Sequence, residues 1–144
     1  MRRLLYSAIV MALSLAAFPS CSKKESVPKV AGDWNIISVT TKSASIGAQA
    51  VDVYLSFAPD GSFTSYQKTG SNPRYVRYSG TWQLTSGVLS GEYADGSPWA
   101  GSYSVSVEGE TMTLTSSSTP AEVSVYKRAE IPDSVIAEAV ILKK

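Results

Sequence analysis

The sequence predicts an all-β fold, an antiparallel up-and-down barrel of about eight strands, followed by a short helix at the C-terminus. Two observations lead to this prediction. Apolar and polar residues alternate from Gly32 onward, and turn residues interrupt the alternation about every 8 to 12 positions. Closing such a sheet into a barrel removes its exposed edges, which favours closure. A sandwich of two sheets with the same strand count stays an alternative at this point.

The strands are expected to follow one another as hairpins, each bounded by a turn. The Asp–Gly pairs at 60–61 and 95–96 are strong turn signals, because these residue types adopt tight-turn conformations at little cost. Along 76–84, every second residue is apolar or glycine and the residues between them are polar. The expected strands are 33–40, 51–57, 63–68, 74–84, 88–94, 99–109, 110–116 and 121–128.

The segment 130–144 has a different pattern. Pro132 followed by Asp133 suits the start of a helix. Apolar side chains then recur every four residues, so they would share one helix face; these are Ile131, Val135 and Ala139. We expect a short terminal helix, or a further strand, that covers one end of the barrel.

The first 20 residues have the layout of a secretory signal peptide. Arg2 and Arg3 give a positive start, and 4–18 is an uncharged, mostly apolar run. This run is shorter than the roughly 20 apolar residues of a membrane-spanning helix. Cys21, the only cysteine, comes directly after a small residue. The arrangement resembles the lipobox of bacterial lipoproteins, in which the cysteine sulfur receives a diacylglyceryl group and becomes the mature N-terminus.

This resemblance implies a lipoprotein that is attached to a membrane of the cell envelope through the lipid on Cys21. We expect the outer membrane, with the protein on its periplasmic or its surface face. Residues 1–20 would be the signal peptide and residues 21–30 a polar tether. The alternative is an ordinary signal peptidase cut near Ala17, which would leave Cys21 as an unmodified thiol.

The composition excludes several kinds of chemistry. The chain of 144 residues contains no histidine and one cysteine, so Ser-His-Asp catalysis, Cys-His catalysis and the usual zinc ligand sets are not available to it. Its formal net charge of +1 provides no basic surplus to neutralise phosphates, so we expect no nucleic-acid partner. Asp60 and Asp95 precede glycines and are explained as turn residues. We therefore expect neither an enzyme nor a cofactor or metal site.

A glycine and a tryptophan begin the first expected strand, in "AGDWNI", as Gly32 and Trp34. Together with "LSFAPDGSF", "YSGTW" and "YSVSVEGETMTLT", this pattern is similar to the Gly-x-Trp signature and the hairpins of bacterial lipocalin-like lipoproteins, which are calycin-type β-barrel domains. The resemblance assigns residues 31–129 to such a barrel. It implies that Trp34 closes one end, with a basic residue of the last strand, Arg128 or Lys127, lying across its ring.

Two interpretations of function follow. In the first, the barrel binds a small hydrophobic or amphipathic ligand, since a barrel of about eight strands can hold one such molecule. The candidate lining residues are Phe57, Phe63, Tyr78, Trp82, Trp99 and Tyr103. In the second, these side chains fill the interior, and the solid barrel is a non-catalytic accessory protein that contacts or inhibits an unidentified envelope protein. A cavity of about 300 Å3 or more would favour ligand binding.

Overall fold

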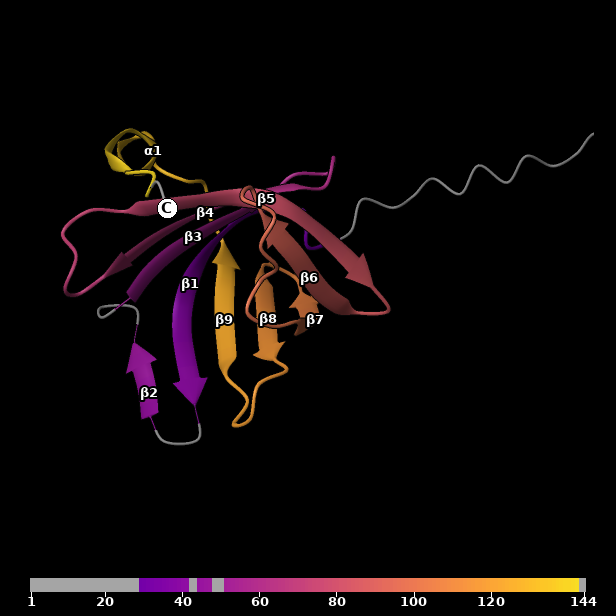
Figure 1. Cartoon of the computed structure of the whole chain (residues 1–144). Coiled ribbons are helices and arrows are strands. Elements are labelled where there is room, and N and C mark those ends of the chain that lie inside the picture. Colours follow the sequence, from indigo (N-terminus) through magenta and orange to yellow (C-terminus); the bar gives the residue numbers. More distant parts are fainter. Residues whose placement is uncertain (1–28, 42–43, 48–50, 143–144) are drawn as a thin grey trace, which may run out of the picture.

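The computed structural model describes residues 29–41, 44–47 and 51–142. These residues form one antiparallel sheet that curls into a barrel, with a short helix on its outside (Figure 1). The predicted signal peptide, residues 1–20, and the predicted lipid-carrying Cys21 lie outside the described residues. Of the predicted tether, residues 21–30, only the last two positions are described.

The described residues contain nine strands and one helix. Eight of the strands, β1 and β3 to β9, form the barrel: each pairs with the next, and β9 pairs with β1. Figure 1 shows β9 lying between β8 and β1. The predicted closed barrel is confirmed, and the sandwich alternative is wrong. The elements are β1 (Gly32–Thr41), β2 (Ala44–Gly47), β3 (Val51–Phe57), β4 (Ser62–Thr69), β5 (Val76–Thr85), β6 (Val88–Tyr93), β7 (Tyr103–Glu108), β8 (Thr111–Ser116), β9 (Val123–Arg128) and α1 (Asp133–Glu138).

The strands differ from the prediction at two places. β2 was not predicted; it pairs with the second half of β1, while β3 pairs with the first half of the same edge. β7 begins at Tyr103, whereas the alternation predicted a strand from Trp99. Residues 94–102 instead form a loop, which is fixed to β6 by the hydrogen bond from Trp99 N to Gly91 O, at 2.9 Å.

Alternation of side chains between the two faces of the sheet places one apolar set inside the barrel. β1 contains a bulge between Ile36 and Ser38, so the extra residue Ile37 faces outward and is 44% exposed. After the bulge, Val39 returns to the interior side and packs against the core. The buried core consists of Val30, Trp34, Ile36, Val53, Phe57, Phe63, Trp82, Leu89, Met112, Leu114 and Tyr126.

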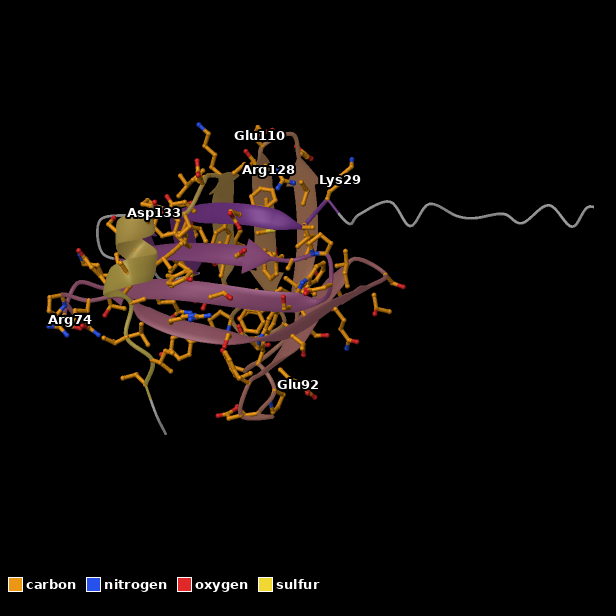
Figure 2. All side chains as sticks on the ribbon, turned by 90° about the horizontal axis from the view of Figure 1, so that it is seen from above. Lys29, Arg74, Glu92, Glu110, Arg128 and Asp133 are labelled. Atoms are coloured by element: carbon orange, nitrogen blue, oxygen red, sulfur yellow. The ribbon has the colours of Figure 1, made fainter. Side chains whose placement is uncertain are left out.

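Trp34 and Arg128 pack against each other at one end of the barrel. Trp34 is fully buried, and its Nε1 donates a hydrogen bond to Val30 O at 2.8 Å. The Arg128 guanidinium lies 4.2 Å from the centre of the indole ring. It also donates hydrogen bonds to Ala31 O at 2.9 Å and to Lys29 O at 2.7 Å. Figure 2 shows Arg128 beside Lys29 on this side of the molecule. We call this the closed end.

Gly32 explains the spacing of the Gly-x-Trp pattern. Its φ of 123° lies in a region that other residues rarely adopt. A Cβ atom at this position would also collide with Nη1 of Arg128. Glycine is therefore required for the chain to turn into β1 while the guanidinium covers the tryptophan.

The C-terminal segment packs on the outside of the barrel rather than over one of its ends. Ile131 and Val135 are buried against Tyr66 and Tyr75, with Tyr54 and Ala139 beside them. Figure 2 shows α1, marked by Asp133, on the outer side of the strands. No helix among the described residues is long and apolar enough to span a membrane.

We predict that replacing Arg128 by alanine lowers the free energy of unfolding by about 1 to 3 kcal/mol. The variant loses a cation–π contact of roughly 0.5 to 2 kcal/mol and two charge-assisted hydrogen bonds. Lys127→Ala is the matched control, because Lys127 is exposed and should change stability by less than about 0.5 kcal/mol. Urea denaturation of both variants measures the difference. Equal stabilities would show that Arg128 does not hold the closed end.

We predict that Tyr126→Phe makes stability less sensitive to alkaline pH. Burial is the main cause that raises the pKa of Tyr126 above its ordinary value of 10.0. Above about pH 10 the hydroxyl therefore ionises first in the unfolded chain, which then binds fewer protons than the folded protein, and stability falls. This one group contributes a slope of up to about 1.4 kcal/mol per pH unit. Denaturation curves recorded across that range should fall less steeply for Tyr126→Phe, and an unchanged slope would contradict the prediction.

Candidate ligand cavity

A cavity of about 260 Å3 lies inside the barrel, toward the end opposite Trp34. Its wall includes Val39 near the end of β1 and Ser124 near the start of β9, both far along their strands from the closed end. Two exposed residues, Ala100 and Glu122, also line it, so the cavity meets solvent between the loops that carry them. We call this opening the mouth. Large aliphatic side chains form one part of the wall, namely Ile36, Val39, Val51, Val53, Leu55, Leu89 and Leu114.

Aromatic rings form the part of the cavity wall where the loop 94–102 crosses β6. The Trp99 ring packs against Gly91, where a Cβ atom would come within 2.6 Å of the indole. Trp99 meets Phe63 edge-on, with ring centres 4.8 Å apart, and Tyr103 at 6.3 Å. Such edge-to-face pairs hold rings in fixed relative positions. Trp99 Nε1 is buried and has no hydrogen-bond partner among the described residues.

Hydroxyl, amide and carboxylate groups are interspersed in this apolar wall. Burial is the main cause that raises the pKa of Tyr93, Tyr103 and Tyr126. The Glu122 carboxylate contributes to the rise at Tyr103 and Tyr126, so it lies near both. The three phenols are therefore neutral at physiological pH and can each donate a hydrogen bond. Ser65, Gln67 and Ser124 are the other uncharged polar residues of the lining.

The six predicted ligand-contacting residues divide into three groups. Phe57, Phe63, Trp99 and Tyr103 line the cavity. Trp82 lies beneath it: the ring packs edge-on against Phe57, with centres 5.4 Å apart, and its Nε1 donates to Ala58 O at 2.9 Å. Tyr78 lines a separate groove on the barrel wall.

Sequence reasoning missed Tyr93, Tyr126 and Glu122 as lining residues. Alternation along the last strand could have placed Tyr126 inside, since it shares a face with Ser124. The position of Glu122 depends on the pairing of β8 with β9, which alternation does not show. Among the described residues, no group of three or more acidic, histidine or cysteine side chains is placed to hold a metal ion.

Comparisons with known proteins agree with this architecture. The family model described as "Lipocalin-like domain" matches residues 30–114, more than half of the chain. No curated protein sequence matches. A lipocalin-like protein from Bacteroides uniformis ATCC 8492 is a structural match with 15% identity and a TM-score of 0.51, covering 69% of this chain and 97% of that one.

Two further solved structures match with TM-scores below 0.5. An uncharacterized protein from Bacteroides eggerthii DSM 20697 has 13% identity and a TM-score of 0.47, covering 67% of this chain and 98% of that one. The REP1-NXSQ fatty acid transporter has 14% identity and a TM-score of 0.42, covering 71% and 97%. Since the family model covers most of the barrel, including Trp34 at the closed end, this chain belongs to the family of lipocalin-like domains.

Proposed function

We propose that this protein binds a small hydrophobic or amphipathic molecule in the barrel cavity, and that it is a binding protein rather than an enzyme. The observation that carries the proposal is the cavity itself, about 260 Å3 of space bounded by aliphatic and aromatic side chains. Ligand sites typically combine such an apolar wall with a few polar groups that fix orientation. The phenols and Gln67 are groups of that kind.

The volume limits the size of what can be fully enclosed. Ligand pockets usually begin at about 300 Å3, and an apolar cavity of about 150 Å3 holds one benzene molecule. By the same ratio, about 260 Å3 suits roughly ten non-hydrogen atoms. The occupant is therefore a small molecule, or one end of a longer molecule.

The cavity also bears on the alternative of a solid accessory barrel. That alternative requires the bulky side chains to fill the interior. Trp82 does pack into the core beneath the cavity, but Trp99 and Tyr103 stand at its wall and leave space between them and Tyr126. The interior is therefore not completely filled, although its space of about 260 Å3 is smaller than the roughly 300 Å3 at which ligand pockets usually begin.

We predict that Ala100→Trp weakens binding of octanol by about tenfold or more, a loss of about 1.4 kcal/mol. Ala100 is exposed and lines the cavity, so an indole there blocks the mouth without disturbing the core. Ala121→Trp is the control, because Ala121 is exposed and outside the lining. Isothermal titration calorimetry with octanol, and native mass spectrometry for co-purifying apolar molecules, provide the readouts. If octanol does not bind, or binds both variants equally, the cavity is not the site.

We also propose that the domain is held at the outer membrane by lipid on Cys21. The support is the sequence alone: an apolar run, a small residue, the single cysteine and a polar segment in succession. Two or more acyl chains are needed for durable attachment, since each buried methylene contributes about 0.8 kcal/mol.

Cys21→Ala should abolish incorporation of radiolabelled palmitate and move the protein into the soluble fraction. Ser22→Ala, one residue along, is the control and should leave labelling and membrane association unchanged. Both are measured by metabolic labelling followed by membrane fractionation. Palmitate labelling that persists in Cys21→Ala would exclude this residue as the attachment point.

A further inference from the structure

Beside the cavity, β5 extends beyond its ladder with β6, and the hydrogen bond from Ala94 N to Ser79 O, at 2.8 Å, is the next contact between these two parts of the chain. β5 begins at Val76, but its pairing with β6 begins only at Gly80, opposite Tyr93. On the β6 side, the first residues of β5 are instead bonded by the C-terminal segment: Arg77 N donates to Val140 O, and Val140 N donates to Tyr75 O, both at 2.9 Å. Figure 2 shows the chain beyond α1 running toward the side of the barrel on which Glu92 of β6 lies.

A second space of about 550 Å3 occupies this region, and we call it the side groove. It lies between the early part of β5, residues 93–95 at the end of β6, and the end of the described chain. Ile141 and Leu142 form one wall of the groove and are 66% and 60% exposed, respectively. Tyr78, the predicted ligand residue that the cavity does not use, lies on another wall.

Two side chains line both the cavity and the side groove: Gln67 and Tyr93. The Tyr93 ring lies 6.0 Å from Phe63, which lines the cavity, and 6.0 Å from Tyr78, which lines the groove. Gln67 is half-buried, and its amide donates a hydrogen bond to the Ser65 hydroxyl at 3.4 Å. The side chains of Gln67 and Tyr93 therefore form part of the partition between the two spaces.

We propose that the cavity and the side groove form one ligand site with two compartments. An elongated amphiphile places its apolar end in the cavity, passes between Gln67 and Tyr93, and holds its polar end in the groove. This inference rests on the proposed function, because it extends the same site. The two spaces together are within the range of about 300 to 1,000 Å3 typical of small-molecule sites, which the cavity alone does not reach.

The charges in the groove indicate the chemistry of the polar end. Arg77 is the only lysine or arginine among the described residues that line either space. The Asp95 carboxylate also lines the groove, but it already accepts hydrogen bonds from the backbone N–H and the hydroxyl of Ser97. An exposed guanidinium presents several donors to a carboxylate or a similar anion. The expected ligand is thus a single-chain amphiphile with an anionic head and a tail of more than about ten non-hydrogen atoms.

The first test compares a short and a long probe of the same chemistry. Octanol fits within the cavity, whereas dodecanol must extend into the groove and should bind more tightly, by roughly fourfold for each further methylene that is buried. Ala94→Trp places an indole in the groove, since Ala94 is exposed and lines only that space. We expect this variant to weaken dodecanol binding by about tenfold or more. Octanol binding should be unchanged, as should dodecanol binding to the control Ala94→Ser.

The second test concerns the head group. Arg77→Gln should weaken the binding of dodecanoate by about tenfold, which corresponds to the loss of one charge-assisted interaction. The affinity for dodecanol should be unchanged. Titration calorimetry of the full mature chain measures all of these affinities. If octanol binds but dodecanol binds no more tightly, the two-compartment site is wrong while the cavity proposal stands. The same conclusion follows if Ala94→Trp does not weaken dodecanol binding. If neither alcohol binds, the proposed function itself fails. If Arg77→Gln lowers the affinities for dodecanol and dodecanoate equally, the assignment of an anionic head is overturned.

Discussion

The pairing of β9 with β1 is the constraint on which the rest of this structure depends. It runs from Trp34 opposite Arg128 to Thr40 opposite Val123, and it joins the first and last strands of the sheet. Without it, the eight strands would leave two unpaired edges and no enclosed interior. The same pairing brings the guanidinium of Arg128 over the Trp34 ring, so ring closure and the plugging of one end result from one interaction.

The packing of Arg128 on Trp34 fills one end of the barrel, so empty space in the interior is confined to the rest of it. At the closed end the interior is filled by Trp34, Phe57, Trp82 and Met112, which are all buried. Toward the other end the lining becomes a mixture of aliphatic side chains, serines and phenols, and these do not fill the volume between them. A barrel of this strand number has little room to spare. Whether it holds a ligand therefore depends on a few residues near the mouth, such as Trp99 and Tyr103.

Much of the fold follows from the sequence because alternation reports directly on which face is buried. The hairpins were predicted in this way, whereas the short helix was predicted from apolar residues that recur every four positions. The resemblance at the Gly-x-Trp pattern implied a basic residue across Trp34, either Arg128 or Lys127. Alternation fails where the backbone departs from regular pairing. The bulge at Ile37 shifts the inward positions of β1 by one residue, and the loop 94–102 interrupts a pattern that continues through Trp99.

The site was only partly predictable, for a related reason. Periodicity identifies inward residues but not their height along the barrel axis, which depends on strand register. Trp82 is inward but lies below the cavity, and Tyr78 is separated from the cavity by Tyr93. The side groove exists because β6 stops at Tyr93 while β5 extends further, a difference in strand ends that composition does not reveal.

The position of Lys29 shows at which end of the barrel the N-terminal part of the chain enters. Its carbonyl is held by Arg128, so the polypeptide enters the barrel at the plugged end. Any segment that precedes Lys29 is joined there, and the mouth opens on the far side. A molecule approaching from the surroundings can thus reach the opening without first passing the point of attachment. Under the proposed attachment through Cys21, the mouth lies at the end of the barrel away from the point where the tether enters.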